Sequence, residues 1–85
     1  MKHASSSTLD VLEPLLVTIR ALPGLKEKNR GTFYRGSKAF LHFHEDPAGI
    51  FADLRVTTDF ERFRATTKRE QAVLVRRVKD ALQPS

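Results

Sequence analysis

The fold of this chain is decided by residues 32–56, TFYRGSKAFLHFHEDPAGIFADLRV. Gly36-Ser37 and the DPAG segment at 46–49 interrupt runs in which apolar and polar residues alternate, and both segments contain residues typical of turns. Glycine adopts a positive φ at no steric cost, and proline presets the φ that a turn requires. The stretch therefore predicts a three-stranded antiparallel meander.

The register of this meander follows from side-chain alternation, because a slip of one residue would turn every apolar side chain to the wrong face. The expected pairs are Arg35–Lys38, Tyr34–Ala39, Phe33–Phe40, Leu41–Leu54, His42–Asp53, Phe43–Ala52 and Glu45–Ile50. One face is expected to form the core, with Thr32, Tyr34, Ala39, Leu41, Phe43, Ile50, Ala52, Leu54 and Val56. The opposite face is expected to carry the function, with Phe33, Arg35, Lys38, Phe40, His42, His44, Phe51, Asp53 and Arg55.

A helix is predicted before the meander. Residues 1–8 are polar and rich in serine and are expected to form a flexible tail. Asp10 is a candidate N-cap, although proline is best tolerated in the first turn, so the regular helix is expected to begin near Glu13 with Pro14 as its first residue. Its apolar stripe is Leu12, Leu15, Leu16, Ile19 and Leu22, and the ALPG segment at 21–24 ends it.

A second helix is predicted at the other end of the chain, from a capping box at Thr67 and Glu70 to about Leu82. Residues 25–31 are expected to be a charged connector, and residues 60–64 fit either a short edge strand or an irregular turn. The element order α-β-β-β-(β)-α predicts a single α+β domain over residues 9–83, a two-layer sandwich in which both helices cover one face of a three- to four-stranded meander.

Length and composition restrict the class of protein. The chain has 85 residues, which suits one domain, and it has no cysteine, which removes disulfides, thiol nucleophiles and thiolate metal ligands. No apolar signal core and no run near the ~20 residues of a membrane span is present, so a cytoplasmic location is expected. The net charge of +5 favours anionic partners such as nucleic acid, or it serves solubility alone.

The run His42-Phe43-His44 indicates a candidate metal site. Both imidazoles project from the same side of the predicted strand, and Asp53 is expected opposite His42. Two histidines and one carboxylate suit zinc or iron(II) and leave coordination positions open. The alternative needs no metal: a cross-strand His42–Asp53 hydrogen bond beside a stack of His44 on Phe51.

Phenylalanines interleaved with cations favour a second chemistry, the binding of nucleic acid. Exposed rings stack on bases while cations contact phosphates. The expected site residues are Phe33, Arg35, Lys38, Phe40, Phe51 and Arg55 on the sheet, with Arg76 and Arg77 on the second helix. Alternatively, the helix cations are a solvated face, and the three phenylalanines are covered by another element or by a second subunit of a homodimer.

Catalysis has little support in the sequence, and the chain is expected to bind rather than to catalyse. It has no glycine-rich phosphate loop and no serine in a nucleophile elbow, and the His–Asp pair lacks a third member. No cofactor is indicated.

The segments Leu22-Pro23-Gly24 and Gly31 to Phe40 (GTFYRGSKAF) resemble the YjbR/MmcQ family and the related YdhG-like domains over roughly residues 9–56. Members commonly have a Leu-Pro-Gly after the first helix, then a strand led by glycine, then a Gly-Lys turn into a strand with phenylalanine. This chain is shorter and lacks their C-terminal half, with its His-rich and Trp-containing segment.

The resemblance has two functional implications. YjbR-like proteins are similar in shape to a double-wing DNA-binding module, which implies that the hairpins around Gly36 and Pro47 are the wings and that Arg35, Lys38 and Arg55 contact the backbone. YdhG-like domains include a frataxin-like iron chaperone, and the matching ligand types in this chain are His42, His44, Glu45, Asp46 and Asp53. The net charge of +5 argues against an acidic iron-collecting surface.

Overall fold

The structure, a computed structural model, describes residues 2–83. Within these residues, two helices and six strands follow one another. Their bounds are β1 Lys2–His3, α1 Ser6–Arg20, β2 Lys26–Asn29, β3 Thr32–Arg35, β4 Lys38–Asp46, β5 Gly49–Arg55, β6 Phe60–Arg64 and α2 Lys68–Leu82. Neither helix has the length and apolar character needed to cross a bilayer.

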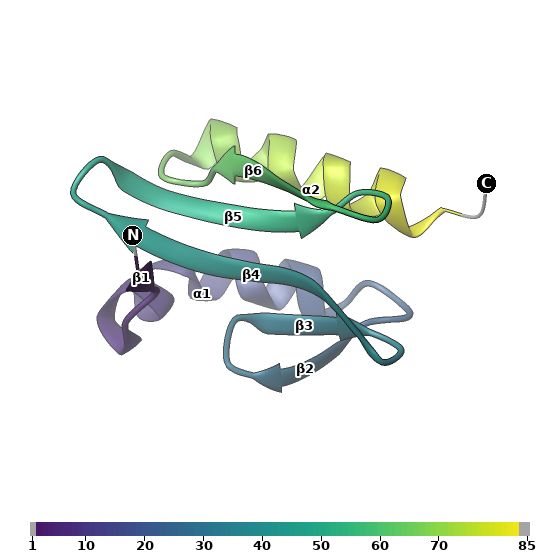
Figure 1. Ribbon diagram of the computed structural model, residues 1–85. Coiled ribbons are helices and arrows are strands. Elements are labelled where there is room, and N and C mark those ends of the chain that lie inside the picture. Colours follow the sequence, from purple (N-terminus) through teal and green to yellow (C-terminus); the bar gives the residue numbers. More distant parts are fainter. Residues whose placement is uncertain (1, 84–85) are drawn as a thin grey trace.

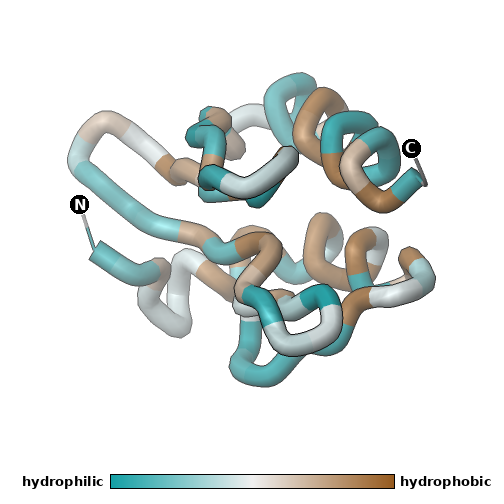
Figure 2. Tube along the Cα trace, turned by 45° about the vertical axis from the view of Figure 1, so that its right-hand side comes forward, coloured by the Kyte–Doolittle hydropathy of each residue, from teal (hydrophilic) through white to brown (hydrophobic). Residues whose placement is uncertain are grey.

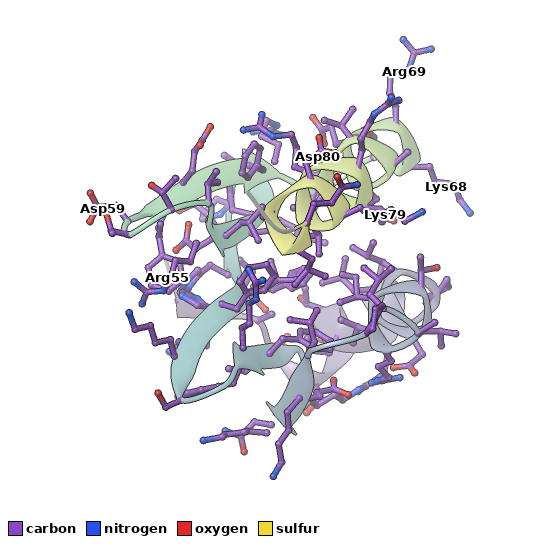
Figure 3. All side chains as sticks on the ribbon, turned by 90° about the vertical axis from the view of Figure 1, so that its right-hand side faces the viewer. Arg55, Asp59, Lys68, Arg69, Lys79 and Asp80 are labelled. Carbon is purple, nitrogen blue, oxygen red and sulfur yellow. The ribbon has the colours of Figure 1, made fainter. Side chains whose placement is uncertain are left out.

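The elements form two layers, as the sequence predicts. Both helices lie behind the sheet in Figure 1, α1 behind β3 and β4 and α2 behind β5 and β6. The end-on view of Figure 3 agrees, with the sheet on one side and both helices on the other. The predicted α+β class, with the N-terminal and C-terminal helices on one face of an antiparallel sheet, is confirmed.

The sheet has the order β2-β3-β4-β5-β6, and β1 adds a short pairing to β4. Between β4 and β5 the predicted register is confirmed, including Leu41 opposite Leu54 and His42 opposite Asp53. The loop is shorter than expected, because Asp46 pairs with Gly49 and the turn contains only two residues. The two-residue turn at 36–37 is confirmed by the pairing of Arg35 with Lys38.

One expected pair is wrong, and the difference removes two phenylalanines from the predicted functional face. Phe33 pairs with Leu41, and Tyr34 pairs with Ala39, so Phe40 is an extra residue without a partner on β3, a β-bulge. Phe33 is 1% exposed and Phe40 is 2% exposed, and both belong to the core. Burial of each ring stabilises by about 1.5–3 kcal/mol, more than the ~1 kcal/mol of one ladder hydrogen bond.

The N-terminal expectation is also wrong for residues 2–8; Met1 lies outside the described residues. Lys2–His3 pair with β4 as β1, and α1 begins at Ser6, where the Ser5 hydroxyl accepts the N–H of Thr8 as N-cap. Pro14 is therefore inside the helix rather than first in it. The buried leucines on either side of Pro14 offset the backbone hydrogen bond that proline cannot make.

Two further segments are strands, one that was expected to be a connector and one that was left open between a strand and a turn. Residues 26–29, expected as a connector, form the edge strand β2, and residues 60–64 form the opposite edge strand β6. Both edges carry charged side chains, which disfavour pairing with a second sheet. The predicted capping box of α2 is confirmed, with the Thr67 hydroxyl accepting from the Glu70 N–H and the Glu70 carboxylate accepting from the Thr67 N–H.

The core lies between the sheet and the two helices. Leu12, Leu16 and Ile19 from α1 are fully buried, as are Leu74 and Val78 from α2. Figure 2 shows α1 mostly in hydrophobic colours and α2 alternating between hydrophobic and hydrophilic, which fits a narrower buried stripe on α2. The opposite face of the sheet is covered by no helix and is called the open face below.

Gly49 is required by the turn between β4 and β5, and we predict that alanine there destabilises the protein. Its φ is +139°, and a Cβ would lie 2.5 Å from Thr66 Oγ1, the hydroxyl that accepts the Ile50 N–H. Gly49→Ala is expected to lower the free energy of unfolding by about 3 kcal/mol, because backbone strain of ~1–3 kcal/mol adds to a disturbed hydrogen bond.

The matched control is Gly36→Ala in the turn between β3 and β4. Its φ of +64° is also positive, but no atom lies within 4 Å of the added Cβ, so a loss of only ~1 kcal/mol is expected. Urea unfolding followed by circular dichroism measures both values. Equal losses would show that the contact with Thr66 has no importance.

Candidate metal centre on the open face

The open face carries side chains from four strands. Residues paired across adjacent strands share a face, so β4, β5 and β6 together place two rows there, His42–Asp53–Arg62 and His44–Phe51–Arg64. The pairing of His3 with His44 adds a third imidazole from β1, and Phe60 pairs with Arg55 at one end. The open face is therefore imidazole-rich at its centre, with an arginine in both rows.

Asp53 is the buried charge of this face, 8% exposed. Arg62 holds it with two hydrogen bonds, from Nε to Oδ1 at 2.8 Å and from Nη2 to Oδ2 at 3.0 Å. These bonds from a guanidinium hold the pKa of the Asp53 carboxyl below its usual value, although burial acts in the opposite direction. Asp53 is thus kept ionised, as a metal ligand must be.

His42 and His44 each bury a ring nitrogen that has no hydrogen-bond partner within residues 2–83, Nδ1 of His42 and Nε2 of His44. Nε2 of His44 lies 3.1 Å from Asp53 Oδ2, within ion-pair distance but without a hydrogen bond between the two atoms. A buried polar atom without a partner costs about 1–3 kcal/mol. Two such atoms beside one carboxylate indicate a site for a ligand.

Burial lowers the pKa of His42 below its usual value of 6.5, and the neighbouring His44 lowers it further, while Asp53 acts in the opposite direction. His42 is therefore neutral near pH 7 and has a lone pair free to coordinate a cation. Its ring also contacts the edge of His44 at 4.7 Å and Phe60 at 5.0 Å between centroids. These contacts hold the imidazole in place.

The three side chains form a compact group, called the His–Asp cluster below: His42, His44 and Asp53. Each offers one ligand atom, and these atoms lie within 4.8 Å of one another. In a tetrahedral zinc site with bonds of ~2.0–2.1 Å, ligand atoms are about 3.3 Å apart, so small rotations of the side chains would suffice. The prediction that these three side chains lie close together is confirmed.

The alternative arrangement expected from the sequence, without a metal, is not the one observed. Asp53 hydrogen-bonds to Arg62 rather than to His42. His44 stacks on His3, with centroids 5.1 Å apart, whereas Phe51 lies under the Arg64 guanidinium. Of the further ligand types suggested by resemblance, Glu45 accepts the Ser5 N–H and Asp46 accepts the Ala48 N–H in its turn. Neither belongs to the His–Asp cluster.

The residues predicted to bind nucleic acid do not share one surface. Phe33 and Phe40 are in the core and cannot stack on bases, so a stacking site or a homodimer contact through these two rings is excluded. Phe51 is half-buried on the open face. The remaining members lie elsewhere: Arg35, Lys38 and Arg55 at the end of the sheet with the turn 36–37, and Arg76 and Arg77 on α2.

Three important side chains of the open face are missing from the sequence prediction: His3, Arg62 and Phe60. The alternation of Phe60, Arg62 and Arg64 signals a strand with these residues on one face, but its five residues also fit a helical turn. Nothing local links His3 to β4, because their pairing joins positions about forty residues apart.

Comparison with family models, with curated proteins and with solved structures found no match to this chain. The resemblance to YjbR-like and YdhG-like domains therefore stays a prediction.

The neutral state of His42 predicts a pH dependence of stability in the metal-free protein. Because its folded pKa lies below 6.5, the unfolded chain takes up a proton first as the pH falls. The contribution of neutral His42 to the free energy of unfolding is fully present above pH 6.5. It is lost as the pH falls through the pKa of His42 in the folded protein. His3, His44, Asp53 and Arg62 are the charged and titratable groups around it.

Urea titrations at a series of pH values from 8 to 5 measure this effect. His42→Gln removes the titrating group and keeps a polar side chain, so its free energy of unfolding is expected to fall less over this interval than that of the wild type. An identical pH dependence in the two proteins would contradict the neutral assignment of His42.

Proposed function

We propose that this protein binds a transition-metal ion, zinc or iron(II), at the His–Asp cluster, and that it does so without catalysis. The observation that supports the proposal is the pair of buried ring nitrogens of His42 and His44, which lack hydrogen-bond partners beside an ionised carboxylate. A coordinated ion would satisfy both nitrogens at once. On the sequence argument we place this role in the cytoplasm.

The contacts around the cluster suit coordination. Arg62 fixes the orientation of the Asp53 carboxylate, and each carboxylate oxygen has two lone pairs, so Oδ2 can accept from Arg62 and still face the ion. Hydrogen bonds from outer groups to ligating carboxylates are usual in metal sites. His42 is held by its ring contact with Phe60. Three protein ligands leave further positions for water or a partner's donor.

Zinc titration followed by calorimetry is expected to show one site per chain, and cobalt(II) is expected to give visible absorption from its coordination by imidazole. His42→Ala is expected to weaken binding on the order of 100-fold, since loss of even an outer partner costs ~10–100-fold. Asp53→Asn, which keeps the size of the side chain, is expected to weaken binding similarly.

The matched control is His3→Ala, because His3 lies on the same face and stacks on His44 but is outside the His–Asp cluster. It is expected to retain the wild-type stoichiometry and an affinity within a few-fold. Amide spectra of each variant verify that it folds. Equal weakening by His3→Ala and His42→Ala would indicate adventitious imidazole binding and contradict the proposal, as would the absence of any zinc binding.

A second candidate function, binding of nucleic acid, is favoured by the charge distribution on α2. Lys68, Arg69, Arg76 and Lys79 are exposed and form no ion pair within residues 2–83, whereas Arg77 pairs with Glu61. Figure 3 shows Lys68, Arg69 and Lys79 extending outward from the helix. Such cations can follow a phosphate backbone without reading bases.

For this candidate we predict a salt-dependent affinity that α2 controls. Fluorescence anisotropy with a labelled DNA duplex and a single strand measures the slope of log K against log salt concentration. The double variant Lys68→Gln/Lys79→Gln is expected to reduce that slope by about 1.8 on the duplex, since each phosphate contact contributes ~0.9.

The control Lys26→Gln/Lys28→Gln removes the same charge from the edge strand β2 and is expected to leave the slope unchanged. If both double variants reduce the slope equally, the protein is attracted to DNA only by its net charge.

A further inference from the structure

The end of the sheet away from the β4–β5 turn contains a hollow of about 150 Å³. The residues on either side of the turn 36–37 and the start of the β5–β6 loop line it. Three cations line it, Arg35 at the end of β3, Lys38 at the start of β4 and Arg55 at the end of β5, and Thr57 adds a hydroxyl. The other lining residues are apolar, and no carboxylate is among them.

Both guanidinium groups are held in place by backbone carbonyls rather than by carboxylates. Arg55 donates from Nε to the carbonyl of Ala39 at 2.7 Å and from Nη1 to that of Thr58 at 2.6 Å. Arg35 donates from Nη1 to the carbonyl of Ala81 at 2.9 Å, near the end of α2. Carbonyl oxygens orient a guanidinium without cancelling its charge, so the positive charge of the hollow stays available to an anion.

Most of the other arginines in residues 2–83 are paired, with Arg69 and Arg76 on α2 as the exceptions. Arg20, Arg30, Arg62, Arg64 and Arg77 each pair with a carboxylate. Arg35, Lys38 and Arg55, in contrast, form no ion pair within the described residues 2–83.

Figure 3 looks at this end of the molecule. It shows Arg55 on the sheet side, Asp59 farther out at the tip of the loop and Asp80 on α2. Neither Asp59 nor Asp80 lines the hollow.

We infer that this hollow binds a single phosphoryl group, as inorganic phosphate or as the phosphate of a small monoester. Its volume is below the roughly 300 Å³ of pockets that enclose whole small molecules, so the phosphate enters and the rest of a monoester stays outside. Arginine N–H groups match phosphate oxygens in geometry, and Lys38 adds a point charge. The hollow shares no lining residue with the His–Asp cluster.

Amide chemical-shift titration with inorganic phosphate, with chloride at equal ionic strength as reference, tests the inference. Shifts are expected at residues 38–40 and 55–58, with saturation at millimolar phosphate. Lys38→Gln, at an exposed residue without an ion pair in the described part of the chain, is expected to weaken binding several-fold. Arg55→Lys keeps the charge but loses the planar donor geometry, and it is also expected to weaken binding.

Lys26→Gln is the matched control and is expected to leave the phosphate affinity unchanged. Adenosine monophosphate and a dinucleotide with one phosphodiester distinguish the sources of the group: the monoester is expected to bind at least as tightly as phosphate, and the diester more weakly. Shifts spread equally over α2 and β2, or equal weakening by Lys38→Gln and Lys26→Gln, would overturn the inference. Diester binding tighter than monoester binding would overturn it in favour of a nucleic-acid backbone.

Discussion

The register between β4 and β5 is the constraint on which the rest of the structure depends. Leu41 opposite Leu54 directs one set of side chains to the helices, and His42 opposite Asp53 directs the alternate set to the open face. A slip of one residue would bring the imidazoles into the core and the leucines to the surface, at a cost of several buried apolar side chains. The same pairing that buries the core therefore assembles the His–Asp cluster, and neither can shift alone.

Within that register, Asp53 is the most demanding group. A buried carboxylate requires a partner, and Arg62 supplies one from the edge strand β6 with two hydrogen bonds. The ion pair joins β6 to β5 on the open face, while α2, which follows β6, covers the other side. The strand β6 therefore determines both the position of α2 and the orientation of the Asp53 carboxylate. His44 then lies against a fixed oxygen rather than a mobile one.

The sequence predicted features that depend on local periodicity. Alternation in residues 38–55 was sufficient to predict the register between β4 and β5, and therefore that His42 lies opposite Asp53. The capping box at Thr67 was sufficient to predict where α2 begins. The prediction from alternation failed where long-range packing outweighs it. Phe40 is in a bulge because the rings of Phe33 and Phe40 are both buried in this arrangement. It could not assign Arg62 to Asp53, since five residues of β6 are too few to separate a strand from a turn. The start of α1 was wrong because Pro14 lies inside a helix whose packing outweighs its cost.

The electrostatics of the open face restrict the ions that the proposed centre can hold. Arg62 cancels the charge of Asp53, so the cluster offers two imidazoles and almost no net negative charge to a cation. A hard ion such as Mg²⁺ or Ca²⁺, which takes most of its affinity from several carboxylates, has little to gain there. Zinc and iron(II) draw affinity from nitrogen donors and tolerate a single carboxylate. The net charge of the chain is +5, and cations without an ion pair in residues 2–83 lie on α2 and around the hollow at the end of the sheet. Selectivity at the open face therefore rests on imidazole nitrogens rather than on charge.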